Sequence, residues 1–95
     1  PCEITCNITN MYFVYVLKSL SDGNLYIGYT NDLKRRLREH NEGVSKSTKF
    51  RRPFELIYFE GCINIKDAIH REKYLKTTYG HQYVRNRLKN YLEDV

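Results

Sequence analysis

Side chains that carry or take up charge occur where a helix would place apolar residues. In the segment 32–41, Leu33 sets an inward face on which the next positions hold Arg36, Leu37 and His40. A guanidinium keeps its charge at any ordinary pH, and an imidazole changes its charge near neutral pH. Such a face indicates that these side chains have a role beyond packing against a core.

A second helical stripe contains a carboxylate. In the segment 65–77, Ile65 begins a face that continues with Ala68 and Ile69, and the next position on it is Glu72, followed by Leu75. An aliphatic side chain is expected at that position. A charge without a partner in a core costs several kcal/mol, so such residues persist where they pair, bind a metal or line a cavity that solvent reaches.

The two exceptions have structural and functional explanations. Arg36 and Glu72 could form a salt bridge at the edge of the core, or Arg36 could extend past Leu33 into solvent. Alternatively, both side chains line a functional cavity, where local rules are often broken. The helical pattern gives these explanations equal weight.

Two tyrosines are candidates for the same site. A hairpin closed by a two-residue turn at Asp22-Gly23 would place Tyr15 and Tyr26 on one face of the sheet, because residues that oppose each other would then sum to an odd number. A β-bulge would reverse this parity. The chain has nine tyrosines, so two of them on one face could equally be core residues.

The elements that must position these side chains predict an α+β fold. Apolar and β-branched runs indicate strands, whereas amphipathic runs with capping residues such as Asn64, and a break at Gly80, indicate helices. We expect a small three-stranded antiparallel sheet flanked by helices, in the order β-β-α-β-α-α. The expected strands are 12–17, 25–29 and 54–60; the expected helices are 32–41, capped by Thr30 or Asn31, 65–77 and 81–91; and a polar, basic loop spans 42–53.

Length and charge narrow the class of protein. The 95 residues suffice for one domain, which we place at residues 12–92, after an N-terminal extension of residues 1–11. The formal net charge of +5 favours an anionic partner, above all nucleic acid. The longest apolar run, 11–17, is far shorter than the ~20 residues that cross a bilayer. We therefore expect a cytoplasmic protein that does not enter a membrane.

Several motifs together resemble a known family. Tyr26-Ile27-Gly28 matches the second tripeptide of the GIY-YIG nucleases, and Phe13-Val14-Tyr15 stands in place of the first, keeping its tyrosine but not its glycine or isoleucine. The basic segment 31–40 and the segments 46–53 and 71–73 follow in the family's order. The chain is most similar to the small single-domain bacterial members, which resemble the catalytic domain of the excision-repair nuclease subunit.

The resemblance implies an enzyme that hydrolyses DNA phosphodiester bonds with one divalent metal, Mg²⁺ or Mn²⁺. Glu72 would bind the metal, since Mg²⁺ needs few protein carboxylates. Arg36 would stabilise the charge that develops on the phosphate, and Tyr15 would take a proton from water, with Tyr26 and His40 assisting. Asn86 matches the family's asparagine better than Asn90 does. The expected catalytic residues are Tyr15, Tyr26, Arg36, His40, Glu72 and Asn86.

The remaining basic side chains would hold DNA by its phosphates. Such contacts position a strand without reading its bases. We therefore expect an enzyme that selects branched or single-stranded DNA by shape, or one that a second protein directs to its substrate, and the resemblance implies a role in DNA repair. The alternatives are a non-catalytic basic module that binds nucleic acid, and a domain that contacts another protein. The expected phosphate contacts are Lys34, Arg35, Arg38, Lys46, Lys49, Arg51 and Arg52.

Overall fold

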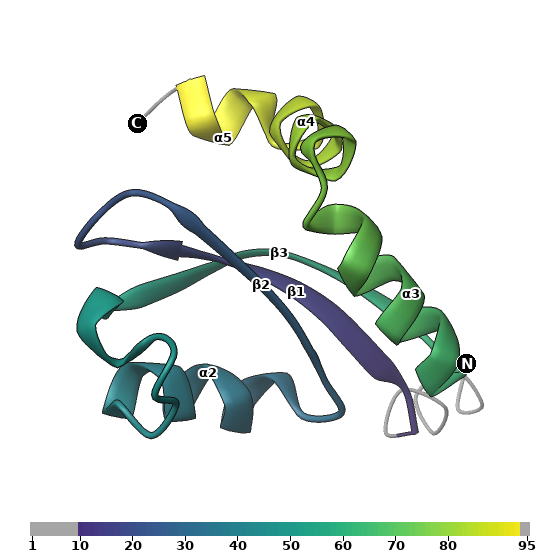
Figure 1. The fold of residues 1–95 in the computed structure, drawn as a ribbon, viewed down its shortest axis with the longest axis horizontal. Helices are drawn as coiled ribbons and strands as arrows, with labels where there is room; N and C mark the ends of the chain where they lie inside the picture. Colours follow the sequence, from purple (N-terminus) through teal and green to yellow (C-terminus); the bar gives the residue numbers. More distant parts are fainter. Residues whose placement is uncertain (1–9, 94–95) are drawn as a thin grey trace.

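A three-stranded antiparallel sheet with helices on both faces forms the described part of the chain, residues 10–93 of a computed structural model (Figure 1). This confirms the predicted α+β class and the order of its elements. None of the helices in residues 10–93 is long and apolar enough to cross a membrane. The elements are β1 (Tyr12–Ser19), β2 (Leu25–Thr30), α2 (Leu33–Glu42), the short 3-10 helix η1 (Lys49–Arg51), β3 (Phe54–Cys62), α3 (Ile65–Leu75), α4 (Thr78–Arg87) and α5 (Lys89–Glu93).

The central strand β1 divides its side chains between two clusters. The strand order is β2-β1-β3, and β1 pairs antiparallel with both neighbours. Val14 and Val16 pack against α3 and α4, whereas Tyr15 and Leu17 pack on the α2 side. Because helices cover both faces, four successive residues of β1 are buried. This explains why β1 reads as a continuous apolar run rather than as an alternating one.

The hairpin keeps the predicted parity although its turn differs. Lys18 pairs with Leu25, so the connection is longer than the two-residue turn that the sequence predicts. The observed pairing register differs from the predicted one by an even number of residues, so that Tyr15 opposes Gly28. Tyr15 and Tyr26 therefore share a face, as predicted, with ring centroids 6.4 Å apart. The β1 irregularity lies in its pairing with β3 and does not disturb the hairpin.

Helix α2 begins and ends at well-defined caps. Asp32 caps it, since its side chain accepts a hydrogen bond from the Arg35 backbone N–H at 3.1 Å. The predicted caps, Thr30 and Asn31, are therefore one or two residues too early. Gly43 ends the helix in the left-handed region at φ 80°.

The boundary between α3 and α4 corrects another prediction. Gly80 does not break a helix: it lies in the first turn of α4, and Thr77 is the cap that accepts its N–H at 3.1 Å. A Cβ on Gly80 would overlap the Tyr74 carbonyl and the Leu75 Cα. The glycine thus lets α4 pack directly against the end of α3. The predicted last helix is also two helices, because α4 ends before Leu88 and α5 follows.

Candidate active site

An open cleft of about 520 Å³ lies beside the edge strand β2. Its lining includes Tyr15 of β1, Tyr26 of β2, Arg36 of α2 and Glu72 of α3. The two helices lie on opposite faces of the sheet (Figure 1), so their side chains meet only around this edge. Four of the six predicted catalytic residues are therefore brought together by elements that are distant in sequence.

Arg36 and Glu72 do not neutralise each other. The Arg36 Nη1 lies 3.0 Å from Glu39 Oε1, and Glu72 Oε2 lies 3.4 Å from Lys76 Nζ. The salt bridge between Arg36 and Glu72 that the sequence left open is not formed. The Glu72 side chain is 17% exposed and faces the cleft. The arrangement leaves the Glu72 carboxylate and the Arg36 guanidinium unpaired with each other in an accessible hollow that Arg35 and Glu39 also line.

Behind the cleft, three side chains form a buried hydrogen-bonded chain. The Tyr15 hydroxyl lies 2.9 Å from His40 Nε2, and His40 Nδ1 lies 2.7 Å from Thr48 Oγ1. His40 and Thr48 are fully buried, and Tyr15 is nearly so. A neutral imidazole carries one proton, so the ring donates one of these bonds and accepts the other. His40 thus has no direct part in the lining of the cleft and reaches it through Tyr15.

Burial sets the protonation of this chain. Burial raises the pKa of the Tyr15 phenol to about 12, although the neighbouring Arg36 acts in the opposite direction. Burial, reinforced by the charge of Arg36, lowers the pKa of His40 to about 4. At neutral pH both groups are therefore uncharged. Tyr15 is not a preformed phenolate, and any proton that it accepts from water must be matched by one that it passes on.

Gly28 explains why the tripeptide 26–28 suits this site. A Cβ at Gly28 would overlap the Tyr15 hydroxyl, which occupies the space above the glycine. Residues 26 and 28 face the same side of β2, so Tyr26 stands beside the opening that Gly28 leaves. The missing side chain thus allows Tyr15 to reach both the cleft and His40.

Thr48 is a site residue that sequence reasoning did not single out. It lies in the basic loop, where its neighbours suggested phosphate contacts, yet its side chain is buried against His40. Asn41 holds the end of the same loop in place. Its Oδ1 accepts a hydrogen bond from the Phe54 backbone N–H at 2.6 Å, and its Nδ2 donates one to the Phe54 carbonyl at 3.1 Å. Thr48 shares the loop with two serines and several cations, so its residue type gave no sequence signal of this role.

The seven predicted phosphate contacts differ in their availability. Arg51 is engaged within the fold: it pairs with Asp22 at 2.8 Å, donates to the Leu25 carbonyl and lies over the Phe54 ring. Arg35 lines the cleft beside Arg36. The other five side chains are exposed on α2 and the loop that follows it; they are Lys34, Arg38, Lys46, Lys49 and Arg52.

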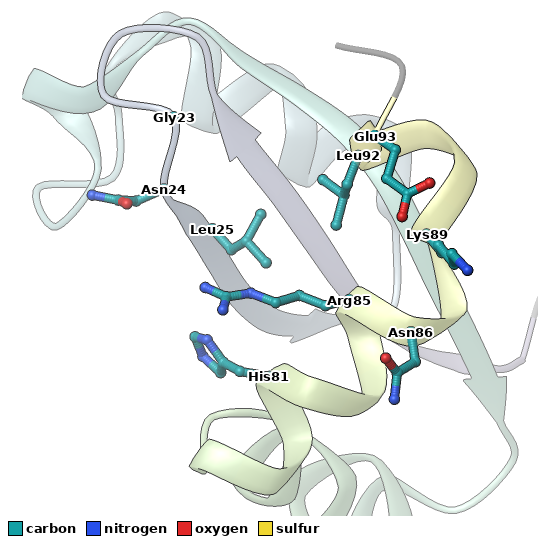
Figure 2. Close-up of a pocket in the computed structure, with 9 residues that line it drawn as sticks. All are labelled: Gly23, Asn24, Leu25, His81, Arg85, Asn86, Lys89, Leu92 and Glu93. Carbon is teal, nitrogen blue, oxygen red and sulfur yellow. The ribbon is translucent and has the colours of Figure 1, made fainter.

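Asn86 lies outside the cleft. It lines a separate hollow between α4, α5 and the start of β2 (Figure 2), and its Oδ1 accepts a hydrogen bond from Gln82 at 3.0 Å. The structure therefore does not bring Asn86 together with the other five predicted catalytic residues. The prediction relied on the order of motifs along the sequence, which does not show on which side of α4 the Asn86 amide lies.

Glu72 has the chemistry of a magnesium ligand. One of its oxygens contacts the exposed Lys76, and the carboxylate opens into the cleft. Mg²⁺ keeps several waters and takes its other oxygens from carboxylates and substrate phosphate. Within residues 10–93 no group of three or more His, Cys, Asp or Glu side chains is placed to hold a metal, so an ion at Glu72 would take its other ligands from water and substrate.

Comparisons with known proteins show the family of the chain. The GIY-YIG catalytic domain family matches residues 11–90. The UPF0213 protein YazA of Bacillus subtilis is 46% identical over 69 residues, which cover 72% of this chain and 69% of YazA. A UPF0213 protein of Bacillus pumilus is 44% identical over 87 residues, covering 90% of this chain and 82% of the relative.

A solved structure shares the fold. The solution NMR structure of the UPF0213 protein BH0048 from Bacillus halodurans has a TM-score of 0.51 and 29% identity, and it covers 80% of this chain and 83% of that one. The family match spans the sheet and the helices that carry Tyr15, Arg36 and Glu72. The chain therefore belongs to the GIY-YIG family, whose nuclease-like domain implies a nucleic-acid substrate.

Proposed function

We propose that the protein is a metal-dependent endonuclease that hydrolyses DNA phosphodiester bonds and selects its substrate by structure rather than by sequence. The observation that carries the proposal is the cleft itself. Arg36 and Glu72 come from helices on opposite faces of the sheet and line one hollow with Tyr15 and Tyr26, without pairing with each other. Ionic side chains kept apart in this way suit a substrate that brings its own negative charge.

Arg36 contacts the reacting phosphate directly, whereas Glu72 would act on it only through a bound metal ion. The Arg36 guanidinium offers several donors in a rigid fork and stays charged throughout, so it stabilises the negative charge that builds up on the phosphate oxygens. Glu72 holds the Mg²⁺ or Mn²⁺ ion, which supplies Lewis-acid stabilisation of the same charge when it is bound. Glu39 holds Arg36 in place through the 3.0 Å contact.

Tyr15 and His40 provide a route for the proton of the attacking water. Tyr15 accepts that proton at its hydroxyl oxygen as it gives its own to His40 Nε2, which requires the ring to carry its resting proton on Nδ1, towards Thr48. The low pKa of His40 keeps Nε2 free to accept at neutral pH. Tyr26, beside Tyr15, orients the water or the phosphate.

The cleft suits recognition of shape. It is open, it lies beside the edge strand β2, and the exposed cations of α2 would contact phosphates without reading bases. The expected substrate is branched or single-stranded DNA of the kind formed in DNA repair. A targeting protein is the other way in which such a domain could acquire selectivity.

The test compares Glu72→Gln and Arg36→Ala with the parent protein. Labelled single-stranded, duplex and flap DNA, together with an RNA strand, are incubated with Mg²⁺ or Mn²⁺. Each variant is expected to lower the cleavage rate by ~10²–10³-fold, with little change in DNA binding for Glu72→Gln. Glu42→Gln, an exposed substitution of the same kind at the end of α2, is the matched control and should cleave like the parent. Equal cleavage by Glu72→Gln and the parent would refute the assignment.

A non-catalytic module that binds nucleic acid is the competing function. It is favoured by the net charge of +5 and by Phe13 in place of the family's first glycine. Phe13, however, packs edge-to-face on Phe59 at 5.9 Å and does not line the cleft, so the replacement leaves the site open. Salt-dependent binding with no cleavage under either metal would establish the competing function instead.

A further inference from the structure

A second hollow lies away from the active-site cleft. It has a volume of about 730 Å³ and is enclosed by α4, α5 and the start of β2 (Figure 2). A smaller hollow next to it shares His81 and Arg85 and extends to Lys76 at the end of α3. We call the two together the α4 groove.

Basic side chains line the α4 groove, and two of them, Arg85 and Lys89, are not used in salt bridges within residues 10–93. His81, Arg85 and Lys89 are spaced four residues apart, and Figure 2 shows the side chains of His81 and Arg85 extending from α4 towards β2. In residues 10–93, neither Arg85 nor Lys89 has a carboxylate within ion-pair distance. Glu93 is the one carboxylate among the residues that line the groove. The groove is therefore a hollow with surplus positive charge.

The lining also has the polar and apolar parts that a nucleotide chain requires. The amides of Asn86 and Asn24 can bind phosphate oxygens or base edges, and Leu25 and Leu92 add apolar surface for sugars and bases. A simple anion needs no such length of groove. A polyanion does, because its phosphates can meet cations on two successive helices, Arg85 on α4 and Lys89 on α5.

The groove adjoins the active-site cleft at two points. Lys76 lines the groove and contacts Glu72, which lines the cleft. Along β2, Leu25 lines the groove and the next residue, Tyr26, lines the cleft. A strand held in the cleft can therefore continue into the groove around the edge of the sheet.

The two cationic surfaces lie on opposite faces of the sheet. The exposed cations of α2 and the loop after it lie on one side, and α4 packs with α3 on the other (Figure 1). A straight duplex cannot lie against both faces at once. A DNA with two arms that diverge at the cleft can contact both.

From this arrangement we propose that the α4 groove binds the phosphate backbone of a second arm of a branched DNA, whose first arm lies along α2. The inference rests on the proposed function, since it places the branch at the active-site cleft. Arg85 and Lys89 provide the principal contacts, and the two arms together determine which DNA structures the enzyme accepts.

The test measures binding, so that it is separate from catalysis. In a Glu72→Gln background, a labelled linear duplex and the same duplex with a single-stranded arm at its centre are titrated by fluorescence anisotropy at several salt concentrations. Arg85→Gln/Lys89→Gln should weaken binding of the armed DNA by about tenfold and reduce the slope of log K against log[salt] by roughly 1.5–2, as expected for two lost phosphate contacts. Binding of the linear duplex should change less than about twofold.

The matched control is Lys66→Gln/Arg87→Gln, which removes the same charge from exposed positions that do not line the groove. It should bind both DNAs like the parent. Unchanged binding of the armed DNA by Arg85→Gln/Lys89→Gln, or an equal loss on both DNAs, would overturn the proposal. Failure of the nuclease assignment would appear instead as equal cleavage by Glu72→Gln and the parent, which does not affect these binding curves.

Discussion

The two faces of the sheet are supplied by the same central strand but bury different chemistry. On the α3 face the buried cluster is wholly apolar and includes Val14, Val16 and Leu75. On the α2 face lie all four buried polar side chains of residues 10–93, which are Ser19, Thr30, His40 and Thr48. None of the buried side-chain nitrogen or oxygen atoms in that range lacks a hydrogen-bond partner.

The difference indicates that one face of the sheet contributes mainly stability and the other mainly reactive groups. Apolar burial on the α3 face supplies much of the stability, since each large aliphatic side chain contributes roughly 1.5–3 kcal/mol when it is removed from water. Polar burial on the α2 face contributes less and requires every group to be paired. We therefore expect substitutions on the α3 face to change mainly stability and substitutions on the α2 face to change mainly reactivity.

The largest expected effect is on catalysis, from Tyr15→Phe on the α2 face. Loss of the hydroxyl removes the proton route and should lower the cleavage rate of flap DNA by ~10³-fold, whereas the free energy of unfolding should fall by only about 1 kcal/mol. Rates and urea unfolding curves measure the two effects. Tyr79→Phe, at an exposed position, should match the parent in both. A variant of Tyr15 that is unstable but fully active would erase the distinction between the faces.

Leu75→Ala is the converse experiment on the α3 face. Leu75 is fully buried, and its truncation leaves a cavity, so the free energy of unfolding should decrease by about 3 kcal/mol. The cleavage rate of the folded protein should stay within about twofold of the parent. Ile63→Ala, at an exposed position, should cost less than about 0.5 kcal/mol. Thermal or urea unfolding, with assays well below the transition, would reveal any loss of catalysis that contradicts this.

Acid should act on the α2 face through His40. The pKa of His40 is lowered from 6.5 to about 4 by burial, so the unfolded chain takes up a proton at a higher pH than the folded one. The stability that depends on neutral His40 is complete above the unfolded pKa and is lost as the pH falls from 6.5 towards 4.

The parent should therefore lose about 2 kcal/mol more than His40→Gln over that interval. Urea unfolding at a series of pH values measures the difference. Carboxylates that are paired in the fold, such as Glu60 with Arg71, add an acid loss that both proteins share. Parallel pH curves for the two proteins would mean that His40 is not held neutral.

The smallest effect is expected at Thr48. Thr48→Val keeps the shape but removes the partner of His40 Nδ1, which should cost about 1 kcal/mol of stability. It should also shift the lower limb of the pH–rate profile, because the proton on the ring is no longer directed to Nδ1. Thr48→Ser restores the hydroxyl and should restore the profile. A valine variant with an unchanged profile would assign Thr48 a packing role alone.

The sequence predicted the positions that helical and strand periodicity control. Arg36, His40 and Glu72 stood out because they interrupt apolar stripes, and the parity of the hairpin survived a wrong turn because the error was an even number of residues. These predictions depend only on local geometry, which the chain encodes over short distances.

Features that depend on contacts between elements were missed. Gly80 looks like a helix breaker until α3 is placed against it, and Thr48 looks like a loop hydroxyl until His40 is placed beside it. Asn86 was assigned by its order along the chain, but the side of α4 on which it lies is decided by how that helix packs on α3. Periodicity within one element carries no information on such neighbours.

The close approach of Tyr15 to Gly28 has a consequence for how such domains diversify. The Tyr15 side chain on β1 occupies the space that a side chain at Gly28 on β2 would need. In relatives that have abandoned catalysis, a larger residue at the glycine position should accompany a shorter one at the tyrosine position, because a Cβ at the glycine would overlap the tyrosine hydroxyl. The residues at positions 15 and 28 should therefore change together, and relatives that keep both Tyr15 and Gly28 should be those that keep the activity.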